Sequence, residues 1–196
     1  NMSKKNSSVN LKNGFKDFKD LSKIFLNFKK KLDKLSQNKF LVAVSGGPDS
    51  LALAFLSKVY SIKWKLSPKF FIIDHKLRPD STKEAKLVKK LLKQKLINSE
   101  ILTWKGKKPS KNIQALARKK RYELLLKRCE KFKIDNILLG HHQDDLFENF
   151  FMRMLRGSGL KGLISLDKKV DLGNKKLLRP LLDQKKEDLV FISKKV

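Results

Sequence analysis

The chain has 196 residues, 40% of them hydrophobic, which is enough for one folded domain with its own core. Its single cysteine, Cys129, excludes an intramolecular disulfide and any metal site built from several cysteines. A net charge of +28, from 47 Lys and Arg against 19 Asp and Glu, favours a polyanionic partner such as RNA. A lysine-rich composition that decorates every solvated face explains the charge equally well. No stretch approaches the roughly 20 apolar residues of a membrane span, and no apolar leader follows the N-terminus, so we expect a cytoplasmic protein.

Short apolar runs alternate with helical patterns along most of the chain. Residues 1–20 are polar and lysine-rich, and we expect a mobile basic segment there, ahead of a folded domain over 21–196. The order of the runs predicts an α/β fold, a parallel sheet with helices on both faces. We expect strands at 40–44, 69–73, 100–104 and 136–140. We expect helices at 21–35, through Leu53, Leu56 and Val59 after the first strand, at 82–96, from the N-cap Asn112 to Phe132, and from about 144 to 156.

A glycine-rich turn, Ser45-Gly46-Gly47-Pro48-Asp49-Ser50, joins the first strand to its helix. A strand that enters a helix through such a turn can hold phosphate, because the first helical N–H groups lack intrahelical acceptors and the dipole favours an anion. An ordinary connecting turn is the alternative, but it would not need two hydroxyls and a carboxylate. The turn has neither the Lys-Ser/Thr end of the Walker A loop nor the G-x-G-x-x-G spacing. It resembles the pyrophosphatase loop of the N-type ATP pyrophosphatase, or PP-loop, superfamily.

Polar residues also follow the other expected strands, where ligands of parallel sheets bind. Asp74 and His75 follow the second strand, and His141 to Asp145 follow the fourth. Asp144, Asp145 and Glu148 lie within about one helical turn, and three such acids repel one another unless a cation such as Mg²⁺ lies among them. An acid-rich first turn that satisfies the helix dipole is the alternative. Three histidines without cysteine partners make a zinc site a poor interpretation.

Two arginines lie near the start of the helix expected at 112–132. Arg118 falls on the same line as the apolar residues Tyr122 and Leu125, which suggests an anionic partner for its guanidinium. Arg121 faces nearby. An equally good interpretation is that both arginines lie on the surface, beside the neighbouring lysines.

Several linked motifs over residues 38–190 resemble the N-terminal catalytic domain of bacterial tRNA(Ile)-lysidine synthetases. They occur in the order found in that family, which makes the resemblance more specific than the loop alone. The residues that carry it are Leu41 to Ser50, Asp74-His75-x-Leu77-Arg78-Pro79, Asn112-Ile113-x-Ala115-x-Ala117-Arg118-x-x-Arg121-Tyr122, His141-His142-x-Asp144-Asp145-x-x-Glu148, Arg156-Gly157-Ser158-Gly159-x-x-Gly162-Leu163 and Arg179-Pro180-Leu181-Leu182.

The resemblance implies a Rossmann-like ATP pyrophosphatase fold and a two-step ligation. ATP would adenylate the C2 oxygen of the wobble cytidine of tRNA(Ile) with a CAU anticodon, releasing pyrophosphate. The ε-amine of free L-lysine would then attack C2 and expel AMP, giving lysidine. The resemblance implies magnesium binding and catalysis for Asp49 and Asp145, and it places Asp144 and Glu148 near the lysine amine. It implies that Arg118 and Arg121 contact phosphate or the adenylated cytidine. The residues implied to bind the nucleotide are Ser45 to Ser50, Asp74, His75 and His141.

The chain departs from the family pattern at two positions, with Lys76 in place of the usual glycine and Asn149 in place of threonine. The resemblance also implies a C-terminal tRNA-binding domain, which these 196 residues do not include. The sequence leaves the oligomeric state open, with a homodimer as one candidate. The alternatives are another PP-loop enzyme that adenylates tRNA, such as a thiolase, for which the lone Cys129 is a poor fit, or a non-enzymatic basic RNA-binding module with the same fold.

Overall fold

The computed structural model describes residues 19–35, 39–106, 113–140, 169–172 and 175–195, and it groups the chain into two compact units, Asn1–Lys34 and Leu35–Val196. The described part of the first unit is a helix over 19–32, in which Lys29 forms an ion pair with Asp33. The apolar spacing therefore predicted this helix correctly, although it ends three residues earlier than expected. The domain boundary at residue 21 stays a prediction.

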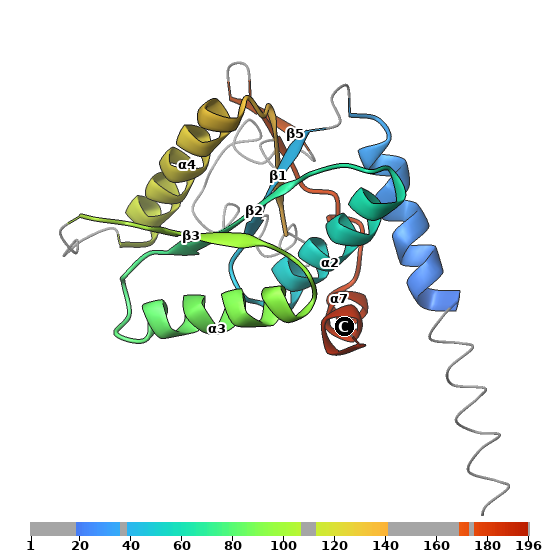
Figure 1. Cartoon of the computed structure of the whole chain (residues 1–196), viewed down its shortest axis with the longest axis horizontal. Coiled ribbons are helices and arrows are strands. Elements are labelled where there is room, and N and C mark those ends of the chain that lie inside the picture. Colours follow the sequence, from blue (N-terminus) through green and yellow to red (C-terminus); the bar gives the residue numbers. More distant parts are fainter. Residues whose placement is uncertain (1–18, 36–38, 107–112, 141–168, 173–174, 196) are drawn as a thin grey trace, which may run out of the picture. The chain divides into compact units, whose positions relative to one another are not determined.

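The second unit is built on a six-stranded sheet with the order β3-β2-β1-β4-β6-β5 (Figure 1). Every neighbouring pair is parallel except β5 and β6, which are antiparallel. The predicted parallel sheet is thus confirmed, and an antiparallel strand at one edge adds to it. The strands are β1 (Phe40–Val44), β2 (Lys69–Asp74), β3 (Ser99–Thr103), β4 (Asn136–Leu139), β5 (Lys169–Leu172) and β6 (Lys175–Leu178).

Strands β5 and β6 were missed by the sequence interpretation, although a signal was present. The two residues between them, Gly173 and Asn174, have the spacing and composition of a two-residue hairpin connection. Both strands are short, and lysines interrupt the run of apolar residues by which a strand is usually predicted. One of them, Lys175, is buried and its ammonium lies 2.6 Å from a carboxylate oxygen of Asp135, so the ion pair makes a lysine acceptable there.

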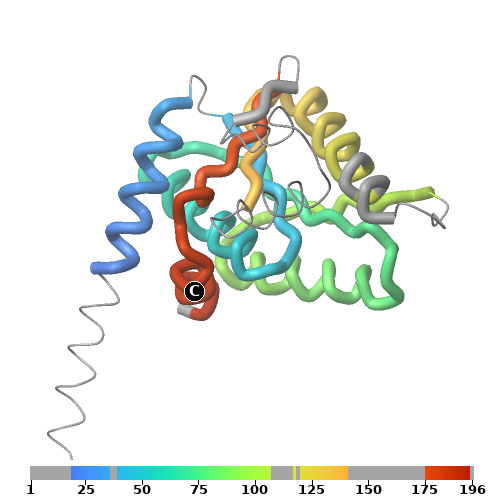
Figure 2. Tube along the Cα trace, turned by 180° about the vertical axis from the view of Figure 1, so that it is seen from behind, coloured from blue at the N-terminus to red at the C-terminus, as the bar shows by residue number. Residues whose placement is uncertain are grey.

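Helices cover both faces of the sheet, as predicted. In Figure 1, α2 (Pro48–Lys63) and α3 (Ser81–Gln94) lie on one face and α4 (Ile113–Phe132) lies on the other. The last helix, α7 (Lys186–Lys195), packs beside α2, as the view from behind also shows (Figure 2). All five residues of β1 are buried, because this central strand has helices on both faces. Alternate residues Leu41 and Ala43 pack in one cluster with Leu125 and Cys129 of α4.

Three helices of this unit end in the same way, with a left-handed residue that is not glycine. Lys65, Leu96 and Lys133 have φ values of 52°, 57° and 51°. After each of them the next N–H bonds back to a carbonyl five residues earlier, at 2.8 to 2.9 Å, which satisfies an otherwise unpaired helix carbonyl. Glycine is the usual residue at this position, because a Cβ makes the left-handed conformation unfavourable by about 1–2 kcal/mol. The hydrogen bonds therefore hold these ends in a conformation that the side chains disfavour.

Across the described ranges, no helix combines the length and the apolar character that crossing a lipid bilayer requires.

Candidate functional site

Ser50 organises the glycine-rich turn between β1 and α2. Its side-chain oxygen accepts hydrogen bonds from the N–H groups of Ser45 at 3.1 Å and Gly46 at 3.0 Å, and its hydroxyl donates to the carbonyl of Gly47 at 3.0 Å. The Ser45 hydroxyl lies 3.2 Å from the same oxygen. Two backbone donors of the turn are therefore used internally, by a side chain that is 4% exposed. The first turn of α2 follows, and its N-cap, Gly47, provides no side-chain acceptor for the N–H groups there.

Two glycines allow close backbone packing around this turn. Gly46 has φ +93°, and a Cβ there would lie 2.6 Å from a methyl of Val88 in α3. Gly140, directly after β4, lies against the first turn of α2, and a Cβ there would lie 2.8 Å from the Cα of Ser50 and 2.9 Å from its nitrogen. Hydrogen atoms at both positions therefore let β4 and α3 approach the turn. Sequence reasoning gave Gly140 no role, because its partner lies 90 residues away along the chain.

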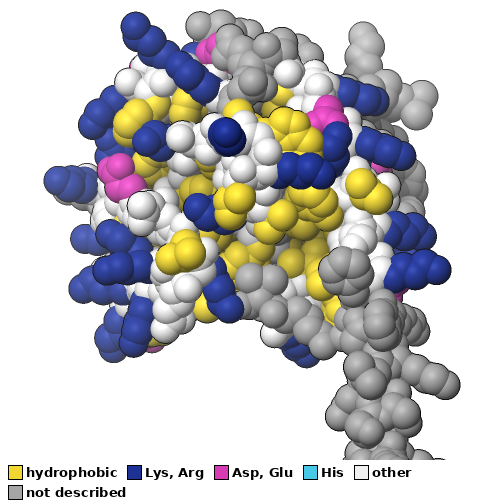
Figure 3. Space-filling view, turned by 45° about the vertical axis from the view of Figure 1, so that its right-hand side comes forward, with side chains coloured by type: hydrophobic (Ala, Val, Ile, Leu, Met, Phe, Trp, Pro, Cys, Tyr) yellow, Lys and Arg dark blue, Asp and Glu magenta, His cyan; other side chains and the backbone are white. Residues whose placement is uncertain are grey.

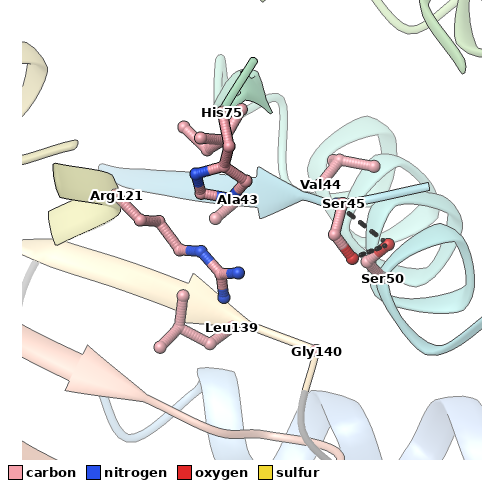
Figure 4. Close-up of a pocket in the computed structure, with 9 residues that line it drawn as sticks. Ala43, Val44, Ser45, Ser50, His75, Arg121, Leu139 and Gly140 are labelled. Atoms are coloured by element: carbon pink, nitrogen blue, oxygen red, sulfur yellow. Dashed lines mark hydrogen bonds between the residues drawn. The ribbon is translucent and has the colours of Figure 1, made fainter. Parts of the chain in front are cut away.

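A cavity of about 90 Å³ opens at the carboxyl ends of β1, β2 and β4, where strand order reverses around β1 (Figure 4). The hydroxyls of Ser45 and Ser50 lie at one end, and the side chains of His75 and Arg121 point into the space from the other. This is the crevice in which open α/β sheets bind ligands. The rest of its lining is mostly apolar and comes from Ala43, Val44, Ile73, Leu139 and Gly140.

The cavity favours the neutral form of His75. Burial, and then the nearby charge of Arg121, lowers the pKa of His75 below its usual value of 6.5, and the carboxylate of Asp74 opposes this only in part. The Nδ1 atom of His75 is buried and finds no hydrogen-bond partner among the residues that the structure describes. The cavity thus combines one guanidinium, one neutral imidazole and two hydroxyls against apolar walls, which suits a flat polar group that carries an anion.

The carboxylate of Asp74 holds the turn after β2. It is 1% exposed and accepts hydrogen bonds from the hydroxyls of Ser81 at 2.8 Å and Thr82 at 2.7 Å, and from the N–H of Lys76 at 3.0 Å. Desolvation alone would raise the pKa of Asp74, but these hydrogen bonds outweigh it and lower the pKa below 3.8. Lys76 itself has φ 52°, so the turn keeps a left-handed residue although lysine stands at this position.

The structure brings together about half of the residues that the sequence singled out. The cavity is lined by Ser45, Ser50, His75 and Arg121. The glycine-rich turn that ends in Ser50 also contains Gly46, Gly47, Pro48 and Asp49. The carboxylate of Asp74 points instead into the turn after β2. The side chain of Arg118 and the residues His141, Asp144, Asp145 and Glu148 lie outside the described residues. Within the described ranges, no three His, Cys, Asp or Glu side chains cluster in a way that could hold a metal ion. Sequence reasoning missed the apolar walls, since Val44, Ile73 and Leu139 look like ordinary strand residues.

Solved structures of other proteins share this fold. The U34-tRNA thiolase NcsA from Methanococcus maripaludis, solved with its [4Fe-4S] cluster, aligns with a TM-score of 0.73 at 21% identity over 89% of this chain and 63% of that one. The NH3-dependent NAD synthetase from Campylobacter jejuni aligns with a TM-score of 0.55 at 13% identity, over 91% of this chain and 72% of that one. At these identities the likeness concerns the fold alone.

Sequence relatives are more similar. The tRNA(Ile)-lysidine synthase of Orientia tsutsugamushi is 44% identical over 151 residues, which are 77% of this chain and 34% of that protein. The tRNA(Ile)-lysidine synthase of Rhodopseudomonas palustris is 40% identical over 152 residues, 76% of this chain and 44% of that protein. The chain thus spans between a third and a half of the length of these relatives. A family model described as a PP-loop domain matches residues 21–196, and the chain therefore belongs to the PP-loop domain family.

Proposed function

We propose that the chain is the ATP-using part of a tRNA(Ile)-lysidine synthase. The cavity at the Ser45–Ser50 turn carries this proposal, because it joins a helix N-terminus, two hydroxyls and a guanidinium at the crevice of a PP-loop fold. The similarity to the lysidine synthases of Orientia tsutsugamushi and Rhodopseudomonas palustris supports the choice of substrate. ATP would adenylate C2–O of the wobble cytidine of tRNA(Ile), and the ε-amine of L-lysine would then displace AMP.

In this proposal the first turn of α2 holds the phosphates that leave as pyrophosphate. The N–H groups of Asp49 and Ser50 lie in that turn, and the dipole of the 16-residue helix α2 favours the anion. Arg121 would stabilise the charge on the transferred adenylyl group from the other end of the cavity. Val44, Ile73 and His75 would border the adenine. Fixed positions and charges, rather than covalent chemistry by the protein, supply the rate enhancement.

Asp49 fits a magnesium ion at this turn, because Mg²⁺ ordinarily takes one or two carboxylates together with phosphate oxygens. When bound, the ion would neutralise phosphate charge. We propose Asp145 as the second carboxylate, and Asp144 and Glu148 as neighbours of the incoming lysine amine. Arg118 would join Arg121 in contacting phosphate or the adenylated cytidine, and His141 would contact the nucleotide.

Thiolation is the weaker proposal, although NcsA has the same fold. Burial raises the pKa of Cys129 to about 11, since the nearby Lys175 opposes the shift only in part, and a thiol of that pKa is a poor nucleophile at pH 7. It is also the only cysteine of the 196 residues. Thiolation would therefore need a sulfur carrier outside these 196 residues.

Release of AMP is the measurement that tests the proposal. The chain is incubated with ATP, Mg²⁺ and a tRNA(Ile) transcript that has a CAU anticodon, with and without L-lysine. We expect AMP to accumulate with lysine, and we expect none with a matched transcript in which the wobble cytidine is replaced by uridine. The proposal is wrong if AMP release is the same with the two transcripts or does not depend on lysine.

A further inference from the structure

Helix α3 carries a continuous band of positive charge on its exposed surface. Lys86, Lys89, Lys90 and Lys93 are all exposed, and their spacing of i, i+3, i+4 and i+7 places them within about 100° of one another around the helix axis. We call these four residues the α3 lysine band. It extends over about 10 Å of the helix, at 1.5 Å per residue.

The charges of this band are not neutralised within the described part of the chain. None of the four lysines makes a hydrogen bond or an ion pair with another described residue. The acids nearby are already used, since Glu84 pairs with Arg78 at 3.1 Å and Asp80 pairs with Lys83 at 3.4 Å. Like charges at these spacings repel one another and destabilise a helix, so the band lowers the stability of the helix that carries it.

The lysines are not spread evenly over the helices of the second unit. Helix α2 has 16 residues and two lysines, whereas α3 has 14 residues and five lysines. Figure 3 shows one face of the molecule, on which Lys and Arg side chains far outnumber acidic ones. On α4, which has two acids, Lys120 pairs with Glu123 at 2.6 Å. The helix over 19–32 also has five lysines in 14 residues, so what distinguishes α3 is that four exposed lysines share one side of the helix.

The helix that carries the band lies close to the candidate site. Val88 belongs to α3 between two of the lysines, and its methyl group is the atom that a Cβ on Gly46 would meet at 2.6 Å. Ala85 and Leu92 are buried on the same side of α3, which packs on β2 and β3. A polyanion bound on the band would lie about one helix diameter, 10–12 Å, from the Ser45–Ser50 turn. The four lysines lie on the outer side of α3, so an RNA bound there would pass around the helix to bring its reacting base to the cavity.

We propose that the α3 lysine band binds the sugar-phosphate backbone of the substrate RNA and positions it beside the ATP-binding turn. The choice of RNA over another polyanion rests on the proposed function. Lysine ammonium groups contact phosphates without reading bases, so the band should contribute affinity for RNA of any sequence. The wobble base would be selected elsewhere.

Binding of a tRNA(Ile) transcript to the chain, in the absence of ATP and lysine and between 50 and 300 mM KCl, tests the inference. Replacing all four band lysines by Gln should weaken binding about tenfold or more at 100 mM KCl, and should reduce the slope of log K against log salt by about 3. Replacing them by Arg should preserve both values. A charge-matched control replaces four exposed lysines of other segments by Gln, namely Lys65, Lys127, Lys186 and Lys194.

Equal losses in the band variant and the control variant would show that only total charge matters and would overturn the inference. A band variant that loses affinity for vesicles containing anionic phospholipid, but keeps its affinity for RNA, would also overturn it. Thermal unfolding serves as a check, because removing like-charge repulsion should leave the midpoint of the band variant unchanged or higher. A chain that binds RNA through the band but releases no lysine-dependent AMP would refute the proposed function and support the band.

Discussion

Replacing Gly140 by alanine tests whether contact between β4 and α2 shapes the ATP-binding turn. The new Cβ would lie 2.8 Å from the Cα of Ser50, 2.9 Å from its nitrogen and 3.0 Å from the carbonyl carbon of Asp49. These are backbone atoms, so no side chain can rotate away. Restoring an ordinary contact of 3.4 Å requires β4 and the first turn of α2 to separate by about 0.6 Å. Gly140 does not have a positive φ, so the effect is steric.

We expect Gly140→Ala to lower the free energy of unfolding by about 1–3 kcal/mol, as overpacking usually does. We also expect AMP formation to fall by about 10- to 100-fold, because a displacement approaching 1 Å in a positioning group can cost about that much. Urea unfolding without ATP, followed by far-UV circular dichroism, measures the first effect. Gly47→Ala is the matched control, since no atom lies within 4 Å of its Cβ position and its φ is −72°. Equal stability of both variants and the parent chain would show that the contact of Gly140 with Ser50 does not constrain the turn.

Three further changes probe single features of the structure. Ser50→Ala removes the acceptor of two N–H groups, and should lower the free energy of unfolding by about 1–3 kcal/mol. It should also raise the Kd for ATP in a calorimetric titration. Unchanged values would mean that the turn does not depend on this hydroxyl. Because the pKa of Asp74 is lowered in the folded protein, its carboxylate contributes to the free energy of unfolding above about pH 4. This contribution is lost as the pH falls through the folded-state pKa. Asp74→Asn should therefore be about 1–3 kcal/mol less stable at pH 7, and its stability should fall less than that of the parent below pH 4; parallel pH profiles would contradict this. Leu96→Gly should raise the unfolding free energy by about 0.5 kcal/mol, because relief of the left-handed strain exceeds the added chain entropy, whereas Leu96→Ala should give no gain.

Local patterns were sufficient to predict the central part of the fold. The run Phe40–Val44 was predicted as a buried strand with the bounds that it has, because five apolar residues followed by glycines fit few other structures. The start of α4 after residue 112 was also predicted, from a good N-cap residue and the apolar spacing. Such features depend on residues a few positions apart, and these are visible in the sequence.

Features that depend on distant residues could not be predicted in this way. The contact of Gly140 with Ser50 and that of Gly46 with Val88 exist only because strands and helices pack together, and no local pattern records them. Lys175 looks like a surface residue until the fold brings Asp135 within 2.6 Å of it. The Asp74 carboxylate was predicted to border a ligand site, whereas its hydrogen bonds within the turn become apparent only with the geometry of Ser81 and Thr82.

The position of β1 between β2 and β4 has a consequence for the order in which the chain folds. β1 pairs with β2 after an interval of roughly 30 residues, but with β4 only after roughly 100. Closing the longer loop costs about 1 kcal/mol more in chain entropy, and parallel pairing over such intervals is slow. The cavity needs both neighbours, because His75 follows β2 and Gly140 follows β4. During synthesis on the ribosome, the glycine-rich turn therefore emerges long before its site can be completed, and nucleotide binding would report that β4 has joined the sheet.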